Sequence, residues 1–416
     1  MTKDRKTIGW YAALCTALVN VVLILALLNA LLFVFYRGRE EKKERTIDTI
    51  IRRYGTNALH AAYPDLDHRQ IEDLLEETWD RQLFEYEPFV QFRERAFAGR
   101  YVNVDPQGYR RTENQGAWPP EPSKANVFLF GGSIVFGYGV RDEETLASHL
   151  QGALSRALGM DVRVYNFGRG FYYSTLERLL LEKLLMEGHR PHLALFVDGP
   201  NDFSEGVGDP FLTAQLRQLV ATASPQAPAG RFLAEWFNRQ PLARWIREWK
   251  AAKEEGESTP LDERRRSWDL AGARPSKEKH RDIKDRSGFA IRQYLNNKKM
   301  IEAVCAVYDV PVLFVWAPTP YYKYDLLYHP FARKSRDSKR ARHTADGYAR
   351  MAEWVRTRSM GTNFLWCADI QEGVQEQLYV DNAHYAPRLN RTLAQIVASG
   401  IVERVPSARL PDGEEE

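Results

Sequence analysis

Residues 125–137 read Ala-Asn-Val-Phe-Leu-Phe-Gly-Gly-Ser-Ile-Val-Phe-Gly, and this stretch decides the fold. Its first six residues form a short, largely apolar run of the kind that makes a buried parallel strand. Two glycines then allow a tight turn, and the acidic residues 142–144 further on suit the first turn of a helix. The pattern therefore predicts that Ser133 lies on a turn at the carboxyl end of a strand, where open α/β sheets bind their ligands.

The alternation of strands and helices continues along the chain. We expect four further strands, one running from Val162 into a glycine turn and the others in residues 193–197, 310–316 and 364–369. Helical patterns occupy residues 146–158, 176–186, 291–308, 345–356 and 390–402. Strands that alternate with helices form a parallel sheet covered on both faces. The sequence therefore predicts the α/β class, as a three-layer α/β/α sandwich with a five-stranded parallel sheet.

A candidate general base for Ser133 lies near the carboxyl end, in Asp381-Asn382-Ala383-His384. A serine hydroxyl becomes a good nucleophile when a histidine takes its proton, and a carboxylate fixes the tautomer of that histidine. An Asp three residues before a His supplies both groups from one loop. The alternative is that this spacing arose by chance and that Ser133 only caps a helix.

Two more turns follow expected strands, and they carry groups that suit an oxyanion hole. The first is Asn166-Phe167-Gly168-Arg169-Gly170, and the second is Gly199-Pro200-Asn201-Asp202. In a parallel sheet both lie beside the Ser133 turn. There a glycine N–H and the Asn201 amide would point at a developing oxyanion, and one such donor is worth about 100- to 1,000-fold in rate. Each segment is equally compatible with an ordinary turn.

The order of these four blocks resembles the SGNH (GDSL-like) hydrolases over roughly residues 126–399, apart from an insertion. The resemblance implies a flavodoxin-like fold, with Ser133 as nucleophile, His384 as general base and acid, and Asp381 orienting it. It also implies that the N–H groups of Ser133 and Gly170 and the Asn201 amide form the oxyanion hole. Gly132 stands where an aspartate often precedes the serine, as in the G-G-S branch of the family, and Gly168 competes with Gly170 for the donor role.

The amino-terminal end predicts a membrane anchor. Residues 7–36 contain no Asp, Glu, Lys, Arg or His, and about 20 apolar residues suffice to cross a bilayer. A cleaved signal peptide is the alternative, but the apolar run is long for one and no small-x-small cleavage site follows it. More Lys and Arg follow the run than precede it, which by itself favours an inward catalytic domain. Because anchored members of the resembled family usually face outward, we expect a single-pass protein of a bacterial inner membrane with its catalytic domain in the periplasm.

Composition narrows the class of partner. The chain has 416 residues, of which 44% are hydrophobic and 27% are charged, as in a globular protein. With 58 Lys and Arg against 55 Asp and Glu, the net charge of +3 does not suggest a nucleic-acid partner. No zinc-binding spacing is present, and the resemblance implies no metal or cofactor. Cys305 and Cys367 lie in apolar surroundings and are expected to be buried thiols, with a disulfide as the alternative.

Together with the remaining segments, these features divide the chain into four parts. We expect an anchor in residues 1–38, a helical preface and lead-in in 39–122, a hydrolase domain in 123–404 and a polar tail in 405–416. The preface contains a charged helical stretch at 40–53, a helix at 71–81 capped by Asp67 with Gln70, and an edge strand at 101–105. An insertion at about 203–288 leaves the Asn201 turn and is either a lid or partner surface, or a solvated loop.

A loop after the fourth strand offers a substrate-binding candidate. It contains aromatic rings that suit sugar faces and polar groups that suit hydroxyls, namely Tyr321, Tyr322, Lys323, Tyr324 and Asp325. A packed loop is the alternative. Together these features predict a membrane-anchored serine esterase that removes acyl groups, acetyl above all, from an envelope or extracellular glycan. The alternatives are an O-acyltransferase with the same triad and a non-catalytic scaffold in polysaccharide export. Protein partners and oligomeric state are not predicted.

Overall fold

In the computed structural model the chain divides into two units, one made of residues 1–44 and 222–258 and the other of residues 45–221 and 259–416. The structure describes residues 3–37, 46–81, 84–208, 210–223, 240–254, 285–335 and 338–405. The tail from residue 406 and residues 224–239 and 255–284 of the insertion lie outside these residues. So does the start of the charged stretch expected at 40–53.

The larger unit is built on a five-stranded parallel sheet with the order β6-β5-β7-β8-β9. Its strands are β5 (Ala125–Gly131), β6 (Val162–Asn166), β7 (Leu193–Asp198), β8 (Val312–Trp316) and β9 (Phe364–Trp366). This order is that of flavodoxin-like sheets, which bind ligands where the strand order reverses, beside the first strand. Ser133 follows that strand.

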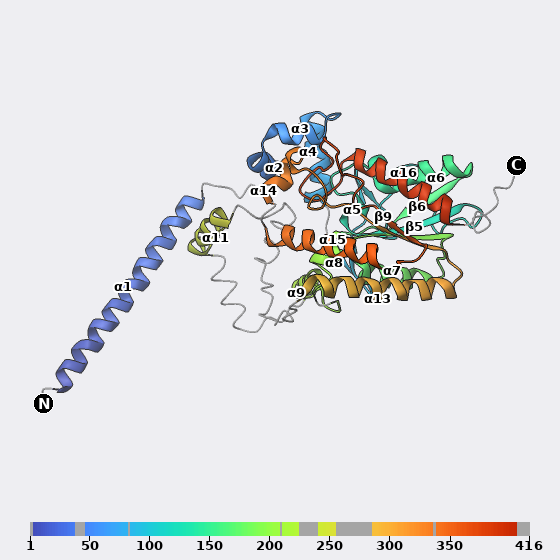
Figure 1. The fold of residues 1–416 in the computed structure, drawn as a ribbon. Coiled ribbons are helices and arrows are strands. Elements are labelled where there is room, and N and C mark those ends of the chain that lie inside the picture. The colour runs from blue at the N-terminus through green and yellow to red at the C-terminus, as the bar shows by residue number, and fades with distance from the viewer. Residues whose placement is uncertain are drawn as a thin grey trace. The chain divides into compact units, whose positions relative to one another are not determined.

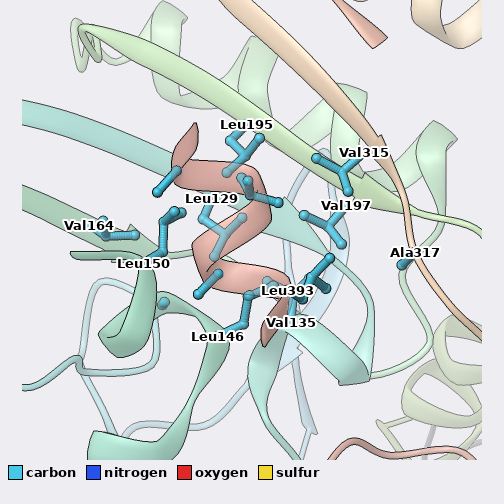
Figure 2. Packing of buried hydrophobic residues seen from close by; sticks show 14 of the residues in the cluster. Leu129, Val135, Leu146, Leu150, Val164, Leu195, Val197, Val315, Ala317 and Leu393 are labelled. Atoms are coloured by element: carbon cyan, nitrogen blue, oxygen red, sulfur yellow. The ribbon is translucent and has the colours of Figure 1, made fainter. Parts of the chain in front are cut away.

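Helices cover both faces of the sheet because β5 points alternate apolar side chains to opposite sides. Val127 and Leu129 pack with α6 (Leu146–Leu158) and α16 (Pro387–Arg404). Phe128 and Phe130 pack with α7 (Ser174–Met186) and α13 (Arg286–Val307). Figure 1 shows these two helix pairs on opposite sides of the sheet, and Figure 2 shows Leu129, Val164 and Leu195 of the sheet against Leu146 and Leu150 of α6. The predicted three-layer α/β/α sandwich is confirmed.

Two helices begin earlier than the apolar pattern indicates, because polar residues cap them. The Asp285 side chain accepts the N–H of Gly288 at the start of α13, five residues before the expected Ile291. Likewise Ser338 accepts the N–H of Ala341 at the start of α15 (Lys339–Thr357). Side-chain caps satisfy N–H groups that have no partner inside the helix. Apolar periodicity locates the buried face of a helix and therefore misses such polar first turns.

The preface packs directly on the nucleophile turn. Its elements are α2 (Thr46–Tyr54), α3 (Thr56–Ala62), α4 (His68–Leu75), a π-helical turn η1 (Glu76–Asp80), and the strands β1 (Phe84–Glu87), β2 (Gln91–Glu94), β3 (Phe97–Ala98) and β4 (Asn103–Val104). The expected Asp67–Gln70 capping box is present, and the expected edge strand is the two-residue β4. One buried apolar cluster joins Leu74 and Trp79 of the preface to Phe136, Tyr138 and Val380. The preface is therefore part of the wall of the site.

Shorter helices complete the larger unit. They are α5 (Ser133–Phe136), η2 (Asp142–Glu144), α8 (Pro200–Ser204), η3 (Leu326–Tyr328) and α14 (Pro330–Ser335). A further helix, α9 (Ala214–Ala223), ends at the boundary between the two units.

The smaller unit consists of α1 (Lys3–Arg37) and α11 (Pro241–Glu254). Residues 14–37 of α1 have a mean hydropathy of 2.8 and are not buried within the structure. By length and composition this helix is able to cross a membrane, either as a retained anchor or as a signal sequence.

Candidate active site

Ser133 lies at the first turn of α5, directly after β5 ends at Gly131. The turn needs glycines because neighbouring groups occupy the space of a side chain. A Cβ at Gly131 would overlap the Val135 side chain, and a Cβ at Gly132 would overlap the Asn201 amide. Gly132 thus lets the Asn201 side chain lie against the turn that carries the serine. Ser133 itself is only half-buried, so its hydroxyl is open to a substrate.

The structure brings Ser133, His384 and Asp381 together in one hydrogen-bonded line. Ser133 Oγ lies 2.9 Å from His384 Nε2, and His384 Nδ1 lies 2.7 Å from Asp381 Oδ2. The other oxygen of Asp381 accepts the N–H groups of Ala383 and His384 at 2.8 and 2.9 Å. These bonds hold the carboxylate so that it accepts the Nδ1 proton, which leaves Nε2 free to accept the serine proton.

Electrostatics keep the carboxylate of this line charged. Burial opposes the charge on Asp381, but His384 and the two N–H donors outweigh it, so the pKa of Asp381 lies below its ordinary value. The Asp381 and His384 side chains are almost fully shielded from water. A charged carboxylate in such a place stabilises the imidazolium that forms when the serine is deprotonated.

Two aromatic side chains hold the His384 ring, and no motif in the sequence indicates either of them. The Trp79 ring, from η1 of the preface, lies 5.3 Å from the His384 ring in an edge-on contact. The Tyr138 ring lies 5.6 Å away and also packs against Trp79 at 4.8 Å. Trp79 belongs to no sequence motif and is one of many buried residues of the preface, so only its tertiary contact with His384 distinguishes it.

Two of the predicted oxyanion donors, the Ser133 N–H and the Asn201 amide, lie at the serine turn. The N–H of Ser133, at the start of α5, has no acceptor among the described residues. Asn201 Nδ2 donates one hydrogen to Tyr172 O at 2.8 Å and lies beside Gly132. An amide nitrogen carries two hydrogens, so a second one is available for an oxyanion. Both groups therefore lie at the serine turn and are able to donate, which are properties that an oxyanion hole needs.

The prediction for Gly170 is not supported, because its N–H donates to Glu94 Oε1 at 2.6 Å. The competing Gly168 is also engaged, since its N–H donates to Asn166 Oδ1 at 3.0 Å. An N–H bonded to a carboxylate is a poor donor for a second anion. The sequence pattern gave the glycine turn correctly, but the acceptor comes from a β-hairpin of the preface that the pattern did not predict.

Glu94 is a buried carboxyl close to the site. Its Oε1 accepts the Gly170 N–H and also the Tyr138 hydroxyl, at 3.0 Å. Burial raises the pKa of Glu94 to about 7, although both hydrogen bonds and the nearby Arg169 act in the opposite direction. Because Tyr138 packs against His384, Glu94 links the Gly170 turn to the His384 ring.

A second set of buried carboxyls lies under the Asn201 turn. Glu177, Asp198 and Asp202 line a small cavity together with Gly132 and Asn201. Burial raises the pKa of Glu177 and of Asp198 well above the ordinary value. The neighbouring carboxyls of Asp198 and Asp202 raise the pKa of Glu177 further. Asp202, whose pKa burial raises to about 6, accepts the Ser174 hydroxyl at 2.6 Å. Protonation therefore keeps this cluster from carrying three negative charges.

The aromatic loop expected to bind substrate is occupied by contacts within the chain. Lys323 pairs with Asp369 and Glu372, Asp325 caps η3, and the Tyr324 hydroxyl bonds backbone groups of residues 376 and 378. The Tyr322 ring packs on Tyr348 and Trp366. Tyr321 is half-buried beside them. These contacts fit the alternative of a packed loop, and the ligand role stays a prediction.

Cys305 and Cys367 are free thiols on opposite faces of the sheet. Burial raises the pKa of each to about 12, so neither is a reactive thiolate. Within the described residues, no group of three or more His, Cys, Asp or Glu side chains is arranged to hold a metal ion.

Comparison with known proteins gives similarity to solved structures only. No protein-family model and no curated protein matches the chain. A lipase from a goat rumen metagenome shares 10% identity at a TM-score of 0.37, covering 67% of this chain and 97% of the lipase. A lipase/acylhydrolase from Enterococcus faecalis shares 13% identity at a TM-score of 0.33, covering 70% and 99%.

A third structure, from Desulfitobacterium hafniense DCB-2, is provisionally assigned to the lipolytic G-D-S-L family. It shares 9% identity at a TM-score of 0.32, covering 67% of this chain and 99% of its own. The solved structures similar to this chain thus include lipases, acylhydrolases and a G-D-S-L protein. Similarity at this level does not assign a function to the chain.

Proposed function

We propose that the chain is a membrane-anchored serine esterase that removes acyl groups through an acyl-enzyme on Ser133. The observation that carries this proposal is the continuous line of hydrogen bonds from Ser133 Oγ through the His384 ring to Asp381. A line of this kind, with the serine half-exposed on a turn and the acid buried, is the arrangement that activates a hydroxyl for attack on an acyl carbon.

In the proposed reaction each step has a group that carries it. Ser133 Oγ attacks the ester carbonyl carbon while His384 Nε2 takes the hydroxyl proton, and Asp381 stabilises the imidazolium. The oxyanion that forms is bound by the Ser133 N–H and the Asn201 amide. His384 then gives the proton to the leaving alkoxide, which departs as an alcohol and leaves the acyl group on Ser133. Water, deprotonated by His384, attacks the acyl-enzyme and releases the acid.

The substrate and the location extend this proposal. A helix of membrane-spanning length in α1 supports retention at a bilayer, and from that position we propose an acylated, preferentially acetylated, envelope glycan on the periplasmic side. In the proposed chemistry a sugar hydroxyl can take the place of water as the acceptor of the acyl group. Transfer is therefore the alternative outcome of the same chemistry.

The test uses the full-length protein in detergent with a chromogenic acetyl ester. We expect hydrolysis by the wild type, a loss of about 10,000-fold or more in Ser133→Ala, and wild-type rates in Ser359→Ala, a matched change at an exposed serine. A fluorophosphonate probe should label Ser133 and no serine of the Ser133→Ala variant. Equal rates in the wild type and Ser133→Ala would exclude the proposal, and acylated sugar product with a glycan acceptor would identify transfer.

A further inference from the structure

The Asn201 turn is bonded at two adjacent points to the chain segment that enters α7. Asn201 Nδ2 donates to Tyr172 O at 2.8 Å. Asp202, the next residue of α8, accepts the hydroxyl of Ser174 at 2.6 Å. Ser174 is the first residue of α7 and lies two positions after Tyr172. The turn therefore holds both ends of the short segment 172–174.

The direction of the second bond is set by Asn297, a residue of α13. Arg178 Nε donates to Asn297 Oδ1 at 3.3 Å, and because a guanidinium cannot accept, this contact identifies the amide oxygen. Asn297 Nδ2 then donates to Ser174 Oγ at 3.0 Å. An amide nitrogen only donates, so the single hydrogen of the Ser174 hydroxyl goes to Asp202. The bonds thus run in one direction, from α13 through Ser174 to the residue beside Asn201.

This chain of bonds is shielded from water. Asp202, Ser174 and Asn297 have exposed fractions of 3%, 1% and 4%. A buried polar group that loses its partner finds no water to replace it, so the bonded arrangement is favoured over others. The segment 172–174 is therefore held in one place relative to the turn.

The position of Tyr172 O decides where the Asn201 amide points. The terminal torsion of an asparagine side chain is soft, so the amide takes the orientation that its hydrogen-bond partner gives it. A Cβ at Gly132 would overlap Asn201 Nδ2 and would touch Tyr172 O, so both groups lie against the serine turn. Oxyanion donors accelerate a reaction because they are oriented before the charge develops. A shift of Tyr172 O would turn the second hydrogen of the amide away from that charge.

We propose that Asp202, Ser174 and Asn297 are positioning residues that set the Asn201 amide for the oxyanion. The proposal rests on the proposed function, in which that amide is an oxyanion donor. Asp202 and Asn297 hold the Ser174 hydroxyl, and Ser174 holds the carbonyl of Tyr172 in place through the backbone. The loss of one of these bonds therefore acts on the rate through Asn201.

The test is a double-mutant cycle on kcat for acetyl-ester hydrolysis, with the full-length protein in detergent. Ser174→Ala removes the hydroxyl, and we expect it to lower kcat by at least about tenfold with little change in KM. In an Asn201→Ala background the same change should lower kcat by less than about twofold, because the amide that it positions is absent. The matched control is Ser287→Ala, which removes a similarly buried hydroxyl that donates to Asp346 at 2.6 Å and should leave kcat near the wild-type value.

Two kinetic outcomes would overturn the proposal. Equal losses from Ser174→Ala in both backgrounds would show that Ser174 acts independently of Asn201, since independent effects add. No loss in either background would mean that another contact fixes the segment, namely the Tyr172 hydroxyl, which donates to Val90 O and Phe92 O.

Asn297→Ala probes the same chain from α13 and replaces Ser174→Ala in the cycle if the latter does not fold. It leaves the bond from Ser174 to Asp202 in place, so we expect a smaller loss in kcat, of about two- to fivefold. This loss should again disappear in the Asn201→Ala background. A loss of the same size there would contradict the positioning role.

Crystal structures of Ser174→Ala and Ser287→Ala give a readout that needs no activity. The bond from Asn201 to Tyr172 O should be lost in the first variant and kept in the second. A wild type that does not hydrolyse the ester would exclude the proposed function. A bond from Asn201 to Tyr172 O that persists in Ser174→Ala would instead exclude the positioning role.

Discussion

The two sides of the candidate site are built differently. On the proton-transfer side, Ser133, His384 and Asp381 already form the hydrogen-bonded line that the proposed reaction requires. On the oxyanion side, the Asn201 amide gives one hydrogen to Tyr172 and the Gly170 N–H is bonded to Glu94. The first side is defined by residues that the motifs contain, and the second depends on the preface carboxyl of Glu94 and on the backbone carbonyl of Tyr172.

This difference has a physical origin. The Asp381–His384 contact is local, because the two residues share one loop and backbone N–H groups of the loop hold the carboxylate. The oxyanion side is held by contacts between distant segments. Arg169, for example, lies in the turn after β6 and forms a buried ion pair at 2.6 Å with Glu87 at the end of β1. Changes on the first side should therefore alter the rate alone, and changes on the second should alter the rate and the fold together.

The largest effect is expected from Asp381→Asn. An amide in place of the carboxylate no longer fixes the His384 tautomer or stabilises the imidazolium, and such a change costs about 10,000-fold in kcat in a serine hydrolase. The measurement is kcat for acetyl-ester hydrolysis, with Asp161→Asn, an exposed carboxylate at the amino end of β6, as the matched control. A loss below about tenfold would show that His384 does not work through Asp381.

Asn201→Ala should cost less, about 100- to 1,000-fold in kcat, because it removes one of two oxyanion donors. KM should change little, since the donor acts when the oxyanion forms rather than when the ester binds. Kinetics on the same ester test this, with the thermal unfolding midpoint measured in parallel. An unchanged kcat would remove Asn201 from the site and leave its bond to Tyr172 as its only role.

The sequence predicted the parts of this molecule that depend on local pattern. Apolar runs gave the five strands, three of which end in glycine turns, and the order of the motifs gave Ser133, Asn201, Asp381 and His384 at one edge of the sheet. It did not predict the bond from Gly170 to Glu94, because a carboxyl in a short hairpin carries no periodic signal. The charge state of Glu94 likewise depends on burial by segments far away in the chain.

Trp79→Phe should have a modest effect that links the two sides. The smaller ring keeps the apolar core of the preface but loses part of the contact with His384. An aromatic pair of this kind is worth about 0.5–1.5 kcal/mol, so we expect a loss of about two- to tenfold in kcat. Trp354→Phe, on α15, is the matched control. If both changes have equal effects on kcat, Trp79 does not position His384.

The smallest effect on rate is expected from Glu94→Gln, which changes pH dependence instead. Glutamine keeps an oxygen that accepts from Gly170 and Tyr138, so activity should remain near the wild-type value. The pKa of Glu94 is about 7 in the fold against an ordinary 4.5, so the folded chain binds more protons than the unfolded chain between these values. The contribution of Glu94 to the free energy of unfolding is therefore fully present at low pH. It declines by on the order of 3 kcal/mol as pH rises through about 7. The variant should lack this decline in its unfolding midpoint.

Glu94→Ala separates the charge of this residue from its hydrogen bonds. Alanine removes the acceptor of both the Gly170 N–H and the Tyr138 hydroxyl, and each buried group left unpaired costs about 1–3 kcal/mol. Tyr138 is then free to move against the His384 ring, so kcat should fall in the alanine variant and not in the glutamine variant. Equal rates in the two variants would mean that the preface supports the fold without positioning the catalytic histidine.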